Sequence, residues 1–191
     1  LQLIREGADI LDIGGESTRP GHTKISDEEE IERVIPFIEA VKDHFDVPIS
    51  LDTYKSHVAK AGIEAGVDLI NDVWGLKYDD QIAKVIAEGQ VACCLMHNRE
   101  KAEYDDFFMN LLKDLEESIS IARNAGIQKS SIILDPGIGF AKTFENNLEA
   151  IRRTGEIRRL GYPVLLGTSR KSVIGLALDV PVTERVEGTL A

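Results

Sequence analysis

The chain has 191 residues, 43% of them hydrophobic, which is enough for one domain with a sizeable core. Its formal net charge of −11, with basic residues dispersed along the chain, argues against binding to nucleic acid. No apolar stretch of the sequence approaches the roughly 20 residues that a membrane-spanning helix needs.

Six apolar segments predict buried strands. They span residues 9–13, 48–52, 68–72, 91–96, 131–135 and 163–167. These segments are mostly apolar throughout rather than alternating, which is typical of strands that are covered on both faces. The two cysteines, Cys93 and Cys94, are neighbours in the fourth segment and would point to opposite faces, so neither a mutual disulfide nor a joint metal site is expected. Cysteine usage of this kind favours a reducing cytoplasm.

Amphipathic helices are predicted between the strands. The first follows Ser26 and Glu29, which form a capping-box pattern, and it carries apolar residues on one face as far as Val41. The other predicted helices span residues 56–65, 79–88, 107–125, 144–160, 173–178 and 183–191.

Strands that alternate with helices predict an α/β fold with a parallel sheet and right-handed crossovers. A doubly wound sheet gathers its ligand at one switch point, whereas polar groups here follow nearly every strand, which favours a closed barrel. A TIM (β/α)8 barrel needs eight strands, so we expect a truncated barrel. Residues 1–191 then form a single domain that is incomplete at both ends, because the sequence begins at Leu1 and stops within a helical pattern.

Polar side chains stand at the carboxyl ends of three of the predicted strands: Asp52, Asn71 and Asp135. Carboxylates accept hydrogen bonds, and an amide both donates and accepts them. This set suits a flat heterocycle whose edge alternates N–H donors with nitrogen or carbonyl acceptors. Each residue could instead cap a turn, where Asp and Asn are common, but three such residues at parallel strand ends favour a binding site.

Lys171 and Ser172 lie where the last predicted strand meets a short helix. A strand, a turn of small residues and a helix start form an anion-binding arrangement, and Ser172 is placed to cap the helix and contact a carboxylate. A solvated loop is the alternative. Upstream, residues 135–143 lack the glycine and lysine spacing of a nucleotide-binding loop. Their glycines let the backbone approach a ligand, with Phe140 as a flat wall.

Thr18 and Arg19 belong to a polar loop that we expect to fold over the pocket and exclude water. The alternative is a surface Arg19 paired with Glu16. His97 is interpreted as a strand-end histidine satisfied by its neighbours rather than as a general base, and Trp74 as a packing residue. No histidine, carboxylate and cysteine spacing supports a zinc site.

At these residues the chain resembles the dihydropteroate synthases, transferases of the folate pathway with a pterin-binding TIM barrel. The run Gly14-Gly15-Glu16-Ser17-Thr18-Arg19-Pro20-Gly21 resembles their second-loop motif and is highly specific. Residues 134–140 and 166–172 resemble the motifs of the sixth and seventh strands, and Asp52-Thr53 and Ile70-Asn71-Asp72 match in order. The resemblance covers essentially the whole chain and implies that it holds strands two to seven.

The resemblance implies the condensation of 6-hydroxymethyl-7,8-dihydropterin diphosphate with 4-aminobenzoate to give 7,8-dihydropteroate and diphosphate. It assigns pterin binding to Asp52, Asn71, Asp135 and Lys171. The 4-aminobenzoate site, which sulfonamides share, is assigned to Thr18, Arg19, Pro20, Phe140, Lys171 and Ser172. Catalytic roles then fall to Asp52, Asp135, Lys171 and Arg19, with the carboxylates stabilising positive charge as diphosphate departs.

The family also uses Mg²⁺, whose protein ligand is expected in a first strand that precedes Leu1. An Arg and a His for the diphosphate are expected in a last strand after Ala191. No metal ligand is therefore assigned within these 191 residues, and we expect the chain by itself to have little activity. A cytoplasmic homodimer is expected for the full-length protein, with small-molecule substrates and neither nucleic acid nor membrane as a partner.

Two other functions stay open at this point. A pterin-binding barrel that serves methyl transfer from methyltetrahydrofolate to a corrinoid protein has the same fold, but it is not expected to carry the Ser-Thr-Arg-Pro loop or the Ser-Arg-Lys-Ser turn. A pterin-binding module without catalysis is the second alternative. The polar groups retained at the strand ends argue against it.

Overall fold

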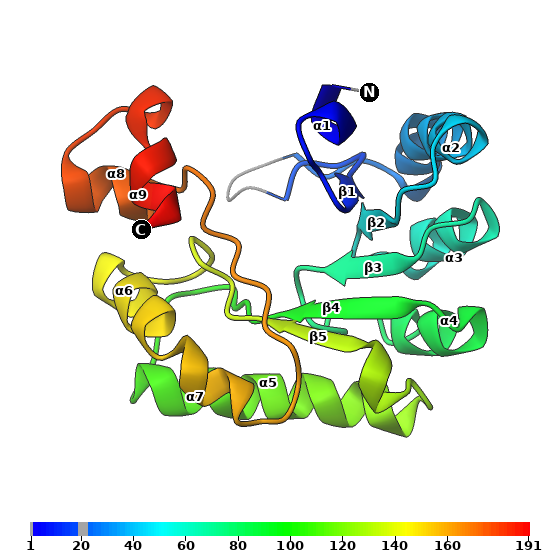
Figure 1. The fold of residues 1–191 in the computed structure, drawn as a ribbon. Helices are drawn as coiled ribbons and strands as arrows, with labels where there is room; N and C mark the ends of the chain where they lie inside the picture. The colour runs from blue at the N-terminus through cyan, green and yellow to red at the C-terminus, as the bar shows by residue number, and fades with distance from the viewer. Residues whose placement is uncertain (1, 19–22) are drawn as a thin grey trace.

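The computed structural model describes residues 2–18 and 23–191, and five parallel strands lie side by side there in chain order. They are β1 (Leu11–Ile13), β2 (Ile49–Asp52), β3 (Leu69–Asp72), β4 (Ala92–Met96) and β5 (Ile132–Asp135). Each strand pairs in parallel with its neighbour, and helices connect successive strands (Figure 1). The predicted α/β class with a parallel sheet is therefore confirmed.

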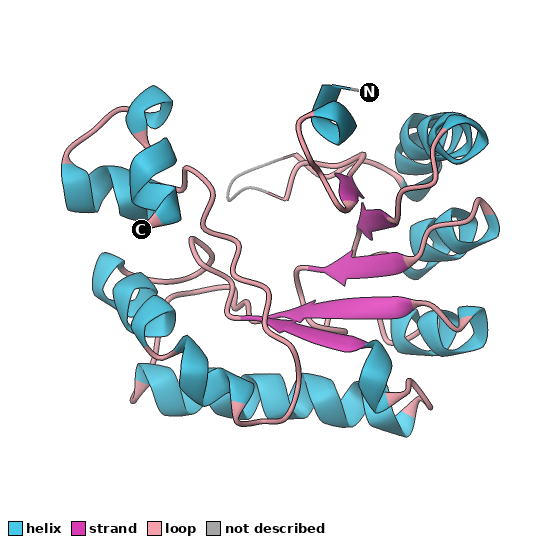
Figure 2. Ribbon diagram, viewed as in Figure 1, coloured by secondary structure: helices cyan, strands magenta, loops and turns pink. Residues whose placement is uncertain are grey.

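The helices of the described residues flank this sheet (Figure 2). They are α1 (Gln2–Arg5), α2 (Asp27–His44), α3 (Ser56–Glu64), α4 (Ile82–Gly89), α5 (Phe107–Asn124), α6 (Phe144–Arg152), α7 (Thr154–Arg158), α8 (Ser172–Leu178) and α9 (Val186–Leu190). Short 3-10 turns occur at Lys129–Ser131 and Val182–Glu184. None of the described helices combines the length and the apolar content that crossing a bilayer requires.

Side-chain caps explain where the long helices begin. The Ser26 hydroxyl accepts the backbone N–H of Glu29 at 3.2 Å at the start of α2, as the capping pattern predicts. The Asp106 carboxylate accepts the N–H of Met109 at 3.0 Å at the start of α5. Each cap satisfies one of the backbone donors that a helix start leaves without a partner, so these boundaries are set locally.

The two faces of the sheet differ in chemistry. One face carries fully buried apolar side chains that pack in the main core with the helices, among them Leu51, Ile70, Leu95 and Leu134. Neighbouring positions on a strand point the other way. The opposite face therefore carries Asp12, Ser50, Asp52, Asn71, Cys94, Met96 and Asp135, which the strand registers align across the sheet. This second face is more polar than the first, but Ser50, Cys94, Met96 and Asp135 on it are buried, in agreement with strands that are covered on both faces.

The sixth predicted strand, residues 163–167, forms one isolated bridge between Val164 and Leu134. Within the described chain it pairs only with β5, and Pro163 has no N–H to donate to a ladder. Leu165 and Leu166 are 45% and 38% exposed, so the segment lacks the cover on both faces that a parallel strand requires. The segment follows the expected path without becoming a strand.

Two predicted helices also differ from the structure. The helix expected at 79–88 begins at Ile82, because the Asp79 carboxylate accepts the N–H groups of Ser56 and Gln81 and holds a turn. The helix expected at 144–160 breaks into α6 and α7, where the Thr154 hydroxyl donates to two carbonyls of the preceding turn. The helical pattern at 183–191 yields only the Val182–Glu184 turn and α9.

Truncating a leucine in the core part of β4 should lower the free energy of unfolding more than truncating a leucine on the surface. Leu95 is fully buried, so Leu95→Ala is expected to lower the free energy of unfolding by about 2–5 kcal/mol. Leu176→Ala, at a position that is 67% exposed, is the matched control and should change it by less than about 0.5 kcal/mol. Urea unfolding of both variants gives the comparison, and equal losses would contradict the assignment of the core.

Candidate functional site

A cluster of hydrogen-bonding side chains lies at the carboxyl ends of β1 to β3. Asp52 and Asn71 are partners in register, so their side chains share the polar face of the sheet. The Thr18 hydroxyl, from the loop after β1, donates to Asp52 Oδ2 at 3.3 Å. Asn71 Nδ2 donates to Asp12 Oδ2 at 3.4 Å. The structure therefore brings together three of the predicted site residues (Thr18, Asp52 and Asn71) and adds Asp12.

The carboxyl group of Asp52 is poised between its two protonation states. Burial raises the pKa of Asp52 to about 7, and the negative charge of Asp12 pushes in the same direction, although the bond from Thr18 opposes both. The side chain of Asp12 is exposed, but the protein atoms around it partly desolvate its carboxylate and raise its pKa, while hydrogen bonds from Ser50 and Asn71 oppose that shift. In the described part of the chain, Asp52 Oδ1 is buried and has no hydrogen-bond partner. A buried acceptor without a donor costs free energy, so this atom is suited to a ligand N–H.

A second cluster lies at the end of β5. Asp135 is 5% exposed, and its Oδ1 accepts the N–H of Gly137 at 2.7 Å. A Cβ atom added at Gly167 would lie 3.4 Å from Asp135 Oδ2 and 3.6 Å from Lys171 Nζ, so these three residues meet. Burial raises the pKa of Asp135, and the charge of Lys171 lowers it in part. Burial likewise lowers the pKa of Lys171, against the charge of Asp135.

Lys171 also contacts the loop between β5 and α6. Its Nζ donates to the carbonyl oxygen of Ile138 at 2.5 Å and lies 5.0 Å from the centroid of the Phe140 ring. Phe140 packs against a small cluster that contains Tyr54 and Met96. Phe140 and Lys171 are neighbours in the structure.

The two clusters lie on the same face of the sheet. Asp52, Asn71 and Cys94 are aligned across β2, β3 and β4, while Met96, two residues after Cys94, is aligned with Asp135 on β5. Neighbouring strands lie about 4.8 Å apart, so β2 and β5 are separated by roughly 14 Å along the sheet. That span accommodates a bicyclic ring with donors and acceptors on opposite edges.

One predicted contact is wrong, and two predicted residues fall outside the description. Ser172 is the first residue of α8 rather than its cap, is exposed, and makes no capping bond, because the chain enters the helix through Lys171 in an extended conformation. Arg19 and Pro20 lie outside the described residues, so their predicted roles are untested.

A buried ion cluster holds the base of the loop that follows β1. Lys55 Nζ lies 2.8 Å from Glu16 Oε2 and 2.8 Å from Glu30 Oε2, and it also donates to the carbonyl of Ile25 at 2.9 Å. Burial alone would raise the pKa of Glu16, but hydrogen bonds from Lys55 and Tyr54 bring it to about 2. This loop carries Thr18, so Lys55 positions a residue that contacts Asp52.

His97 confirms the interpretation of a satisfied strand-end histidine. It is buried, with Nε2 3.1 Å from Asp114 Oδ2 and Nδ1 2.9 Å from Lys142 Nζ. Burial lowers the pKa of His97 to about 4, so the ring is neutral near pH 7. Trp74 is a packing residue as predicted, lying against the cluster that contains Tyr54.

The sequence analysis missed three residues of this region: Asp12, Lys55 and Lys142. Asp12 interrupts an apolar strand at its penultimate residue, and that interruption was the available signal. Lys55 and Lys142 gave no local signal, because their partners are distant in sequence.

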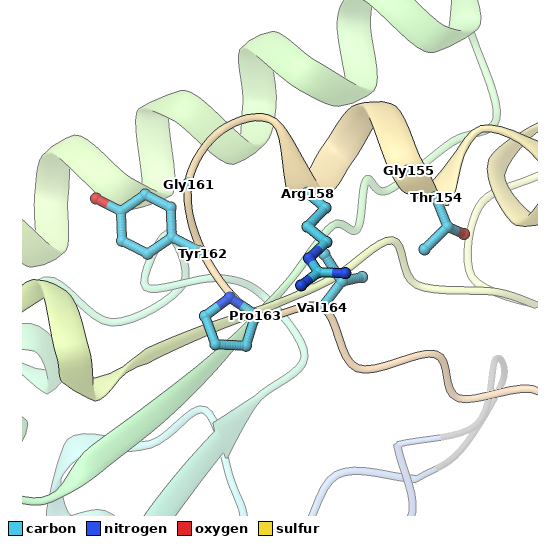
Figure 3. A pocket seen from close by; sticks show the side chains of 7 residues that line it. All are labelled: Thr154, Gly155, Arg158, Gly161, Tyr162, Pro163 and Val164. Atoms are coloured by element: carbon cyan, nitrogen blue, oxygen red, sulfur yellow. The ribbon is translucent and has the colours of Figure 1, made fainter.

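The described residues contain no group of three or more His, Cys, Asp or Glu side chains that could hold a metal ion. A cleft of about 720 Å³ lies beneath α7, with Arg158 and Tyr162 among its walls (Figure 3). None of the predicted site residues lines this cleft. The predicted site residues that the structure describes lie at the strand ends and in the adjoining loops rather than in this cleft.

Comparison with known proteins places the chain in a family. The model of the pterin binding enzymes matches residues 1–191. The chain belongs to the pterin-binding enzyme family. It is 59% identical to the dihydropteroate synthase of Clostridium beijerinckii over 190 residues, covering 100% of this chain and 71% of that protein. The Bacillus subtilis dihydropteroate synthase is 52% identical, with 98% and 66% covered. The chain thus spans about two thirds of the length of these relatives.

Solved structures of dihydropteroate synthases show the same architecture. The Clostridium difficile enzyme, crystallised in the presence of pteroic acid, has a TM-score of 0.96 at 48% identity, covering 99% of this chain and 72% of that one. The Xanthomonas albilineans enzyme with 4-aminobenzoic acid has a TM-score of 0.94 at 41% identity, with 99% and 70% covered. Within the pterin-binding family the chain groups with the dihydropteroate synthases, and its sheet is part of a TIM barrel. The comparisons do not favour the methyl-transfer alternative.

The raised pKa of Asp52 predicts a pH-dependent cost in stability. Its pKa is about 7 in the folded protein against 3.8 for the ordinary side chain, so the unfolded chain ionises first. The contribution of Asp52 to stability therefore falls between about pH 4 and pH 7 and stays low above it. Asp52→Asn removes this loss. The free energy of unfolding of the variant relative to wild type should therefore be higher at pH 8 than at pH 4 by on the order of 2–4 kcal/mol. Urea unfolding at both pH values measures the gain, with exposed Asp46→Asn as the control.

The Lys55 cluster predicts a large loss when its cation is removed. Lys55→Met leaves Glu16 and Glu30 buried without their cation, which should cost about 3–5 kcal/mol in the free energy of unfolding at pH 7. Lys60→Met, on the exposed face of α3, should cost little. If both variants unfold at the same urea concentration, the cluster does not hold the loop.

Proposed function

We propose that the protein containing this chain is a dihydropteroate synthase. It joins 6-hydroxymethyl-7,8-dihydropterin diphosphate to 4-aminobenzoate, breaking the carbon–oxygen bond to diphosphate and forming a carbon–nitrogen bond, with loss of a proton from the amine. The observation that carries the proposal is the buried Oδ1 of Asp52, an acceptor without a donor beside Asn71. Relatives up to 59% identical that bear this name support it.

The pterin occupies the space between the two clusters. Asp52 accepts a ring N–H at Oδ1, and Asn71 both donates and accepts at the ring edge. A hydrogen bond to the charged form lowers the pKa of an acid, so pterin binding favours the ionised form of Asp52. Asp135 and Lys171 bind the opposite edge, where the ammonium donates to the pterin carbonyl.

Catalysis is assigned to positioning and electrostatics. Diphosphate departure leaves positive charge on the pterin methylene, which the carboxylates of Asp52 and Asp135 stabilise from a partly desolvated face. The aromatic amine then attacks the methylene, so no protein nucleophile is required. Phe140 supplies the flat wall for the benzoate ring, Thr18 orders the adjacent loop, and Arg19, Pro20 and Ser172 are assigned to the same subsite.

Magnesium, a homodimer, sulfonamide binding and a cytoplasmic location are further parts of this proposal. No step is assigned to the metal, because the described residues do not provide a set of ligands for it. Residues 1–191 are proposed to act as one pterin-binding domain.

The deciding assay measures pyrophosphate release from the pterin diphosphate in the presence of magnesium, with and without 4-aminobenzoate. Release that depends on the amine supports the synthase. Corrinoid-dependent methyl transfer, or pterin binding without any turnover, would each contradict it. The 191-residue chain assayed by itself is expected to give little release, because the β1 edge and residues 163–167 leave its sheet open.

Substitutions test the assigned residues. Lys171→Ala and Asp135→Asn should each reduce turnover by at least about 10²–10³-fold, because each removes a charge that faces the reacting group. Circular dichroism should show an intact fold in both variants. Exposed Lys101→Ala and Asp80→Asn are the controls and should retain wild-type rates. Near-normal turnover in both site variants would remove the assignment.

A further inference from the structure

Lys142 is a partly buried lysine that the proposed chemistry does not use. Its Nζ lies 2.9 Å from His97 Nδ1, 3.3 Å from the His97 carbonyl oxygen and 3.0 Å from the Phe140 carbonyl oxygen. All three acceptors are uncharged, and the described residues include no carboxylate within ion-pair distance of this ammonium. Burying a cation in this way is costly, so a role beyond simple stability is worth seeking.

The surroundings of His97 leave its Nδ1 free to accept a hydrogen bond from Lys142. His97 Nε2 faces Asp114, which also accepts two bonds from Arg99 at 2.7 and 3.2 Å. A carboxylate opposite Nε2 keeps the proton on that nitrogen, which leaves Nδ1 as an acceptor for Lys142. The neutral ring therefore orients the ammonium rather than competing with it for a proton.

The other contacts of Lys142 reach the wall of the proposed pocket. The loop of residues 136–143 holds its backbone in unusual conformations, with positive φ at Gly137, Gly139 and Ala141. Two of its carbonyls accept hydrogen bonds from side chains outside the loop, Ile138 from Lys171 and Ala141 from the Tyr104 hydroxyl, and the Phe140 carbonyl accepts one from Lys142 within the loop. The loop is thus fixed from both sides, and Lys142 joins it to the end of β4.

We propose that Lys142 is a positioning residue for the proposed reaction: it clamps the 136–143 loop to His97 and so places the Phe140 wall and the Ile138 carbonyl beside Lys171. The inference rests on the proposed function, because Phe140 and Lys171 are assigned there to the 4-aminobenzoate subsite. Lys142 itself touches neither substrate in this assignment. Its effect reaches the reaction through the loop and through its charge.

The charge of Lys142 also acts on Asp135. Positive charge on Lys142 and on Lys171 lowers the pKa of Asp135 against the effect of burial, while the Gly137 N–H lowers it further. Burial lowers the pKa of Lys142 to about 7, opposed by Asp135 and Asp114 and assisted by Lys171 and Arg99. Lys142 is therefore protonated below pH 7, where Asp135 must be ionised for the proposed chemistry.

Lys142→Met tests the clamp, since it keeps the length of the side chain but removes the donor and the charge. The KM for 4-aminobenzoate should rise about tenfold or more, because a displaced wall weakens the binding of the second substrate. The acidic limb of the pH profile of kcat/KM for the pterin diphosphate should move to higher pH, because Asp135 loses a stabilising cation. Lys142→Arg should restore most of both values, and exposed Lys101→Met should change neither.

A measurement without substrate separates this inference from the proposed function. Hydrogen exchange in residues 136–143 should become faster in Lys142→Met than in wild type, and it should stay unchanged in Lys101→Met. An inactive wild-type protein with this exchange pattern would remove the proposed function but keep the clamp. An active wild type matched by Lys142→Met in KM, pH profile and exchange would overturn the inference.

Substitution of the histidine keeps the test open if Lys142→Met fails to fold. An Asn at position 97 can place its carbonyl oxygen near the position of Nδ1, whereas a Gln places its amide nitrogen near Nε2. His97→Asn should therefore preserve the contact with Lys142. Its KM for 4-aminobenzoate should be lower than that of His97→Gln. The reverse order, or equal values in the two variants, would contradict the clamp.

Discussion

The strict alternation of side chains along each strand is the constraint on which this structure depends. One set of positions packs against the helices, and the other set lies on the opposite face of the sheet. Because the strands are parallel and in chain order, the same alternation aligns Asp52, Asn71 and Cys94 across three strands. A shift of one residue in any strand would exchange its core side chains for its polar ones. The core and the proposed site are therefore specified together.

That arrangement gathers acids on one surface, and this has an energetic cost. Asp12, Asp52 and Asp135 all have raised pKa values, with burial as the largest cause in each case. Asp72, whose pKa burial also raises, lies on the opposite, core face, and its carboxylate accepts the N–H groups of Trp74 and Leu76. Asp52 lacks such compensation at Oδ1. In the proposed reaction, a donor group of the ligand and the positive charge that develops on it would stabilise the Asp52 carboxylate at this atom.

The sequence predicts the parts of this picture that are encoded locally. Apolar segments, caps and glycine stops locate five of the six strands and most helix starts, and the position of Asp52, Asn71 and Asp135 after apolar runs predicts that they share a surface. The sixth segment has the same composition but gains only one bridge, because a strand also needs neighbours that its own residues do not specify. Ser172 has the right type for a cap, yet the backbone enters α8 one residue earlier. Tertiary pairing decides these cases.

Lys55 and Lys142 show most clearly why residue type alone does not reveal a role. Lys55 lies between the carboxylates of Glu16, in the loop after β1, and Glu30, in α2. These opposite charges compensate for its burial, so its pKa is raised despite desolvation. Lys142 is surrounded by uncharged acceptors and its pKa falls to about 7. Stability alone does not explain a lysine at position 142, because an apolar side chain of similar length would fill the position at a lower cost in free energy. Lys142 donates to the Phe140 carbonyl, and its charge lowers the pKa of Asp135. These two effects give the cation a role in the proposed reaction.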